Sequence, residues 1–276
     1  MDGVWGTVNY LAPGSTRNRL YVAPGEQRAT ARYEPHQVFV ADGRPCQDDL
    51  TLEGAGFTLV QHQTSVPSLD NPAVLDGAYT GESIALVRAL TGADYVVSLG
   101  WLARRTTADR RGALPPAPDV HVDLHTTEIA HRYARVHARS GLPAPGTYRR
   151  AVWTSLWRAF SPPPQDWPLA VCDYRSTDDE DGTPNLLFRV PVLPALDAQD
   201  APDDEAESAA SLFFYNAAHR WWYFPGMHAG EALLVKLHDT DHSVAWRAPH
   251  TSFLDHAADG AHPRESVELR TVAYYR

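Results

Sequence analysis

Turn-forming residues interrupt this chain at short intervals along almost its whole length. Its 276 residues include 22 prolines and 18 glycines, which lie between short apolar runs such as 37–40, 57–60 and 95–99. Proline removes a backbone donor and glycine favours turns, so both work against long uninterrupted helices. Apolar runs of about four to eight residues between such turns are typical of β-strands. The chain is therefore predicted to be mainly β and not a helix bundle.

The same pattern predicts further strands and two flanking helices. The later strands are expected at residues 152–160, 169–172, 186–193, 212–215, 220–224, 232–237, 243–246 and 266–275. A helix is predicted over 79–91, where apolar residues recur at helical spacing and Gly92 follows as a stop signal. A second helix is predicted from about 126 to 140, beginning at a threonine cap. Because no repeat or linker divides the chain, residues 1–276 are interpreted as a single domain.

Charge and cysteine content exclude several classes of protein. Lys and Arg sum to 24 against 34 Asp and Glu, a net charge of −10, which argues against nucleic acid as a partner. Cys46 and Cys172 are far apart and form no metal-binding pair, which fits a reducing cytoplasm. The N-terminus has no signal-peptide pattern and no run of about eighteen apolar residues occurs, so we expect neither secretion nor membrane spanning. A homodimer is left open.

A histidine and an aspartate stand two residues apart in the middle of the chain. If residues 121–123 form a strand, the side chains of His121 and Asp123 share one face, because side-chain direction alternates along a strand. Two imidazoles and one carboxylate form the facial triad that binds Fe(II) in oxygenases and leaves positions open for cosubstrate and oxygen. A third ligand must then come from elsewhere in the chain.

The best candidate for the third ligand is His250, because a predicted anion anchor follows it fourteen residues later. Arg264 and Ser266 would share one face of a strand, and a guanidinium with a hydroxyl suits a carboxylate. 2-Oxoglutarate would chelate iron through its keto acid end and would need such an anchor for its other carboxylate. The residues therefore predict an Fe(II) site with 2-oxoglutarate as cosubstrate.

The same segment allows a zinc hydrolase as an alternative. His121 and His125 stand four residues apart, the spacing at which two histidines on a helix bind zinc. Val122 occupies the position of the general-base glutamate of those hydrolases. Pro118 and the Thr126 cap favour extended backbone between them, which favours the iron site.

These motifs, with others in the same order along nearly the whole chain, resemble those of Fe(II)- and 2-oxoglutarate-dependent dioxygenases. The likeness is narrower for the fungal and bacterial branch that contains the cephamycin 7α-methoxylation protein and tailoring oxygenases of terpenoids and polyketides. The segments that carry it are residues 42–44, 56–57, 91–93, 156–158, 168–173, 175–176, 222–227, 231–232, 239–240, 249–253 and 264–270. One departure is Ser155, which stands where the Asn-x-Trp motif of the branch has asparagine.

The resemblance implies a double-stranded β-helix, the jelly roll of cupin-like proteins, with the metal at the mouth of the barrel. It implies an enzyme that uses O2 to oxidise a C–H bond of a small natural-product intermediate, by hydroxylation, desaturation, epoxidation or rearrangement. The residues that it assigns to iron, and then to the distal carboxylate of 2-oxoglutarate, are His121, Asp123 and His250, followed by Arg264 and Ser266 with Arg270 as a second candidate.

Two other functions stay open at this point. A related chain can act as a non-catalytic scaffold or partner subunit, although the complete His, Asp, His set argues against it. A cupin-like metalloenzyme could work without 2-oxoglutarate, and the pair Arg264 and Ser266 argues against that. A strongly anionic carrier-bound substrate would need a basic patch, for which the candidates are Arg104, Arg105, Arg110 and Arg111.

Overall fold

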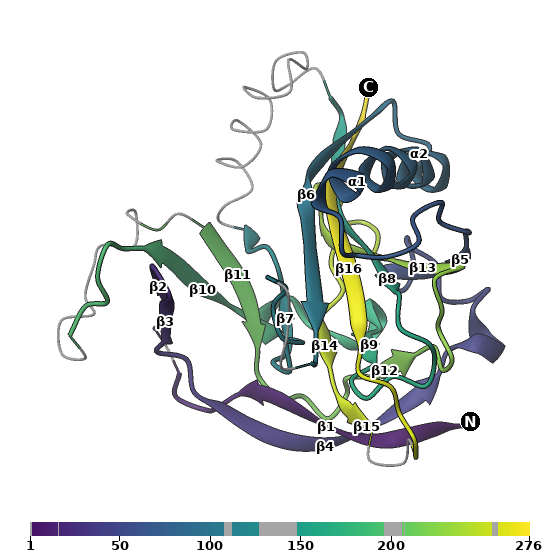
Figure 1. Cartoon of the computed structure of the whole chain (residues 1–276). Helices are drawn as coiled ribbons and strands as arrows, with labels where there is room; N and C mark the ends of the chain where they lie inside the picture. The colour runs from purple at the N-terminus through teal and green to yellow at the C-terminus, as the bar shows by residue number, and fades with distance from the viewer. Residues whose placement is uncertain are drawn as a thin grey trace.

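The computed structural model describes residues 2–15, 17–107, 112–126, 148–195, 206, 208–255 and 259–276. Within these residues the strands form two sheets (Figure 1). In spatial order, the larger sheet consists of β15 (Leu254–Asp255), β1 (Gly3–Leu11), β4 (Tyr33–Asp42), β12 (Trp221–Tyr223), β9 (Leu169–Cys172), β14 (His250–Ser252), β7 (His121–Val122), β11 (Ser208–Phe213), β10 (Gly182–Arg189), β2 (Asn18–Ala23) and β3 (Glu26–Ala29).

The smaller sheet is antiparallel throughout and joins strands from both halves of the chain. In spatial order it consists of β5 (Phe57–Gln61), β13 (Glu231–Asp239), β8 (Arg150–Ala159), β16 (Glu265–Tyr275) and β6 (Tyr95–Arg105). β16 lies between β8 and β6 and pairs with each of them over nearly its full length. Side chains on this strand are therefore held by backbone hydrogen bonds on both sides.

The two sheets pack face to face and enclose the main core. Trp157 and Val235 of the smaller sheet share one buried cluster with Val171 and Trp222 of the larger sheet. Residues with the opposite parity in the smaller sheet, such as Leu234, face outward to a different cluster. This alternation leaves one inward row of side chains on each strand, as expected for a jelly roll.

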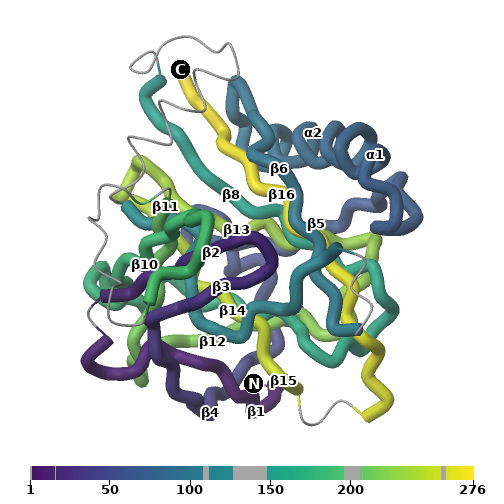
Figure 2. The backbone as a smooth tube through the Cα atoms, turned by 60° about the vertical axis from the view of Figure 1, so that its left-hand side comes forward, coloured from purple at the N-terminus to yellow at the C-terminus, as the bar shows by residue number. Residues whose placement is uncertain are grey.

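A helical segment covers the outer face of the smaller sheet. It consists of α1 (Pro72–Val74), a π-helical turn (Leu75–Tyr79) and α2 (Thr80–Thr91). Asn71 caps its start by accepting a hydrogen bond from the Ala73 amide, and Gly92 ends it in the left-handed conformation with φ 66°. Figures 1 and 2 both place the helices beside the smaller sheet, away from β2, β3 and β10.

Most of the predicted strands are present, with one clear exception. Residues 243–246 form no strand, although Ala245 and Trp246 are buried. The Ala245 amide donates to the Glu53 carbonyl in a loop, so this apolar run satisfies its backbone without a ladder. The strand predicted at 186–193 is displaced and runs from 182 to 189. The aromatic run 221–224 alternates between two core clusters, as its strand assignment requires.

The helix predicted over 79–91 is confirmed by α2, while its continuation back to Pro72 was not predicted. The helix predicted from 126 to 140 lies, after its first residue, outside the described residues, as do Arg110 and Arg111. Among the helices that are described, none combines the length and the apolar character needed to cross a lipid bilayer.

Replacing Leu234 with alanine tests how much the outer face of the smaller sheet depends on the helix. Leu234 is fully buried against Val87 of α2, so the cavity left by Leu234→Ala should lower the free energy of unfolding by about 2–5 kcal/mol. Urea denaturation measures this change. Leu90, which is 38% exposed on the same helix, is the control: Leu90→Ala should stay within about 0.5 kcal/mol of the parent. Equal effects would contradict this packing.

Candidate active site

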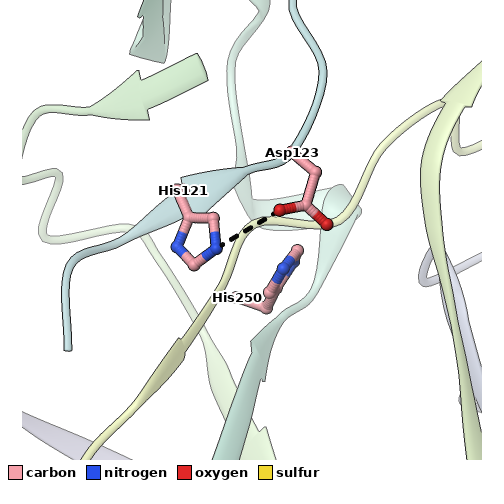
Figure 3. Close-up of side chains that lie close together, drawn as sticks. All are labelled: His121, Asp123 and His250. Atoms are coloured by element: carbon pink, nitrogen blue, oxygen red, sulfur yellow. Dashed lines mark ion pairs between the residues drawn. The ribbon is translucent and has the colours of Figure 1, made fainter. Parts of the chain in front are cut away.

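Two short strands of the larger sheet bring the predicted histidines together. β14 pairs with β7 in antiparallel register, so that His250 lies directly opposite His121. The centroids of the two imidazole rings are 4.6 Å apart. Asp123 follows immediately after β7, and Figure 3 shows its carboxylate and both rings converging on one region. The ligand atoms of the three side chains all lie within 4.8 Å of one another.

Backbone carbonyls fix which nitrogen each ring presents. The Nδ1 atom of His121 donates to the Asp119 carbonyl at 2.7 Å, and Nδ1 of His250 donates to the Ala248 carbonyl at 3.1 Å. A carbonyl only accepts, so both rings carry their proton on Nδ1 when neutral. Each Nε2 lone pair is then free to bind a metal, which is the usual arrangement of metal-binding histidines.

The two carboxylate oxygens of Asp123 have different surroundings. Oδ1 lies 3.7 Å from Nε2 of His121 and accepts a hydrogen bond from Arg270 at 2.9 Å. Oδ2 is buried and accepts no hydrogen bond from any described residue. A buried oxygen without a donor is costly unless a cation binds it.

Burial and charge set the protonation states of these groups. Burial, assisted by the neighbouring His250, lowers the pKa of His121 to about 4. Burial, the largest single influence, would raise the pKa of Asp123, but the nearby Arg270, His250, His121 and Arg104 together outweigh burial and hold that pKa below its usual range. At neutral pH the site therefore presents a neutral imidazole and an ionised carboxylate, the forms that bind a divalent metal.

A cavity opens beside the histidines. Its wall comes from both sheets and includes Arg104, Ala117, His121, Ser155, Trp157, Leu169, Val235, His250, Thr251, Ser252, Arg264 and Glu268. Ser155, the departure from the Asn-x-Trp motif, therefore lies on the wall itself. The cavity connects the candidate metal ligands with the candidate anion anchor.

Arg264 is a buried cation on the cavity wall. Its Nη1 donates to the Trp167 carbonyl at 2.6 Å and to the Ser252 hydroxyl at 2.8 Å, and the guanidinium lies over the Trp157 ring. No acidic side chain of the described residues forms an ion pair with it, and Nε has no hydrogen-bond partner among them. Burial and the neighbouring Arg104 lower the pKa of Arg264 to about 9. The Arg264 guanidinium is therefore buried without a carboxylate partner among the described residues.

Ser266 continues the inward row of β16 next to Arg264. Its hydroxyl is buried and makes no hydrogen bond with any other described residue. It does not line the cavity itself, whereas Arg264 and Glu268 on either side of it do. A hydroxyl with spare hydrogen-bonding capacity beside a buried guanidinium suits a carboxylate ligand.

Arg270 differs from Arg264 because it is engaged with acidic side chains. Its Nη2 donates to Asp123 at 2.9 Å and to Glu268 at 2.9 Å, and Glu268 also lies 3.5 Å from Arg104. Glu268 was not predicted as a site residue, although it lies in the same alternating row of β16 as Arg270.

The basic patch predicted for a carrier-bound substrate is not free at its described positions. Arg105 pairs with Asp70 and Glu265, and Arg104 lies beside Glu268, so neither arginine forms a free basic patch.

The residues present fit an Fe(II) centre better than the zinc alternative. Two free Nε2 atoms and the unpartnered Oδ2 of Asp123 supply the two nitrogens and one oxygen that the facial triad requires. His121 and His125 do not share a helix, because β7 and an extended segment occupy this stretch. Among the described side chains, the only group of three with metal-binding spacing is His121, Asp123 and His250.

Known proteins resemble this chain over nearly its whole length. A family model described as "Oxidoreductase/YMDC permease-like domain" matches residues 8–274. The Fe(II)/2-oxoglutarate-dependent dioxygenase nvfI of Aspergillus novofumigatus is 29% identical, over 94% of this chain and 92% of its own. The hydroxylase/desaturase efuI of Hormonema carpetanum is 28% identical, over 98% of this chain and 94% of its own.

A solved structure supports the same relationship in three dimensions. The iron and alpha-ketoglutarate-dependent endoperoxidase NvfI superposes with a TM-score of 0.82 at 26% identity, and the match covers 99% of this chain and 98% of that one. This agreement confirms the predicted jelly roll.

Metal binding should stabilise the protein through the three converging side chains. At a free Co(II) or anaerobic Fe(II) concentration near 100 times the dissociation constant, the free energy of unfolding should rise by about 2.7 kcal/mol. Thermal unfolding with and without metal measures this gain, which His250→Ala and Asp123→Ala should abolish. His228, an exposed histidine elsewhere on the surface, serves as control, and a gain lost equally in His228→Ala would contradict the assignment.

Proposed function

The chain belongs to the family of the oxidoreductase/YMDC permease-like domain and is an Fe(II)- and 2-oxoglutarate-dependent dioxygenase. We propose which of its residues perform each part of that reaction. His121, Asp123 and His250 hold the iron, and Arg264 with Ser266 holds the distal carboxylate of 2-oxoglutarate. The observation that carries this proposal is the cavity that joins the two histidines to a buried arginine without a carboxylate partner.

His121, Asp123 and His250 would hold the iron as a three-residue set, with both histidines on the cavity wall. When bound, the iron supplies the redox chemistry by which O2 and 2-oxoglutarate are converted to succinate and CO2 while a substrate C–H bond is oxidised. The protein holds both Nδ1 protons on backbone carbonyls, so neither imidazole can rotate away. The side chains of Trp157, Leu169 and Val235 form an apolar part of the cavity wall, which would help to exclude water from the reacting groups.

Arg264 fits the cosubstrate because it lacks the anion that a buried guanidinium needs. Its Nη1 is fixed by Trp167 and Ser252, while Nε has no partner among the described residues and is left for a ligand. Ser266 adds a hydroxyl donor in the next position of the same row. A dicarboxylate can then bind with one end on the metal and the other end on this pair.

The charges around the cavity favour an uncharged natural-product intermediate as the substrate. Asp123 and Glu268 together balance the charges of Arg104 and Arg270, and Arg264 is taken by the cosubstrate. No described cation on the wall then remains for a substrate carboxylate. The relatives named hydroxylase/desaturase and dioxygenase, all from fungi, support secondary metabolism as the setting.

We propose further that residues 1–276 act as one oxygenase domain, since both sheets contribute side chains to one cavity. A cytoplasmic location, a homodimer and the narrower likeness to the cephamycin 7α-methoxylation branch remain predictions from the sequence.

Anaerobic titration with 2-oxoglutarate tests the cosubstrate site. Addition to the Fe(II)-loaded protein should produce the weak visible charge-transfer band of a chelated keto acid. Arg264→Met should weaken 2-oxoglutarate binding by roughly 10- to 100-fold, because it removes charge-assisted hydrogen bonds worth about 1.5–3 kcal/mol. Arg88→Met, on the exposed face of α2, should leave the titration unchanged.

A keto acid without the distal carboxylate provides the matched control for this experiment. 2-Oxobutyrate should bind the parent protein about as weakly as 2-oxoglutarate binds Arg264→Met, and the variant should weaken 2-oxobutyrate little further. Equal loss for both keto acids would refute the anchor. Tight metal binding with no band would favour the cupin-like alternative, and no metal binding at all would favour a non-catalytic scaffold.

Matched pairs of compounds test the charge of the substrate. A panel of terpenoids and polyketides, each as free acid and methyl ester, can be screened for stimulation of succinate release. Esters and other neutral members should stimulate turnover, while their acids should not, because burying an unpaired carboxylate is costly. Consistent preference for the acids would contradict an uncharged substrate.

A further inference from the structure

Four charged side chains form a continuous row that begins at a candidate metal ligand. Asp123 pairs with Arg270 at 2.9 Å, Arg270 pairs with Glu268 at 2.9 Å, and Glu268 pairs with Arg104 at 3.5 Å. The signs alternate along the row, so each inner member is attracted from both sides. The row runs from the metal centre to the cavity wall, where Glu268 and Arg104 lie.

Arg270 holds the central position of this row on a firmly anchored strand. A single atom, Nη2, donates to both Oδ1 of Asp123 and Oε1 of Glu268. The residue belongs to β16, which is paired on both sides by β8 and β6. The guanidinium is therefore fixed by two carboxylates and by a strand whose backbone cannot shift easily.

Asp123 depends on this contact because its own backbone gives it little support. β7 consists of His121 and Val122 alone, and Asp123 lies just beyond its end. Among the hydrogen bonds of the described residues, the one from Arg270 is the only one its side chain accepts. That bond occupies Oδ1 and leaves the buried Oδ2 free. The two carboxylate oxygens therefore differ, since Oδ1 accepts a hydrogen bond and Oδ2 is available to a metal.

We propose that Arg270 is a positioning residue that holds Asp123 as a one-oxygen iron ligand through Oδ2, and that it is not an anchor for 2-oxoglutarate. This inference rests on the proposed iron site. It assigns separate tasks to Arg264, which directly precedes β16, and to Arg270, which lies within it. Arg264 lines the cavity without an acidic partner, whereas Arg270 does not line it and is paired twice. A ligand held at one oxygen keeps a metal position open for cosubstrate or O2.

Two binding constants, measured on the same variants, separate these tasks. The affinity for Co(II) is measured by calorimetry and by the visible spectrum of bound Co(II), and the affinity for 2-oxoglutarate is measured at saturating metal. Arg270→Met should weaken metal binding by roughly 10- to 100-fold and alter the Co(II) spectrum, since loss of such a supporting hydrogen bond has effects of this size. Its affinity for 2-oxoglutarate should change by less than about 3-fold.

Arg264→Met should give the opposite result, with metal affinity retained and 2-oxoglutarate binding weakened. Arg270→Lys keeps the positive charge and should fall between the parent and Arg270→Met in metal affinity, which a general loss of folding would not reproduce. Thermal unfolding of each metal-free variant identifies any that do not fold, and Arg270→Lys then carries the comparison.

The outcomes distinguish this inference from the proposed function. If Arg270→Met binds Co(II) within about 2-fold of the parent with an unchanged spectrum, Arg270 does not position Asp123. If it loses 2-oxoglutarate and keeps the metal, Arg270 is the cosubstrate anchor and our assignment is wrong. If the parent protein itself binds no metal, the proposed iron site fails, and the inference fails with it.

Discussion

One backbone register in the larger sheet determines whether the proposed iron ligands come together. β14 and β7 are each only a few residues long, and they come from distant parts of the chain, yet their antiparallel pairing places His250 opposite His121. A shift of one residue would turn either histidine to the other face of the sheet. The neighbours of these strands, β9 and β11, pair with them over further residues and so fix the register. The site is thus an outcome of sheet topology.

The smaller sheet contributes the charged wall by the same alternation. Val267 and Leu269 of β16 pack outward beneath the helical segment, while the alternate positions face the larger sheet. Inward positions of a closed sandwich are normally apolar, so a run of arginine, serine, glutamate and arginine there is expensive unless each charge finds a partner. Glu268 supplies that partner for Arg270 and Arg104. Arg264 has no acidic partner among the described residues.

Sequence reasoning predicted those parts of the site that depend on local spacing. The shared face of His121 and Asp123 follows from strand alternation alone. His250 was chosen from its spacing to Arg264 and was supported by a family resemblance, because pairing between distant strands leaves no local signal. Glu268 could have been predicted, since it lies in the same alternating row as Arg264. Residues 243–246 were predicted wrongly, because an apolar run buried in a loop has the same composition as a strand.

The charge balance around the proposed metal and cosubstrate sites explains why the two ligands should bind as a pair. Three guanidinium groups, those of Arg104, Arg264 and Arg270, stand against the carboxylates of Asp123 and Glu268, a net charge of +1. Fe(II) alone would raise this balance by two positive charges in a poorly solvated space, and 2-oxoglutarate alone would lower it by two. Both together leave it unchanged, so each ligand removes the electrostatic cost of the other. The cosubstrate therefore stabilises the metal through charge as well as through chelation.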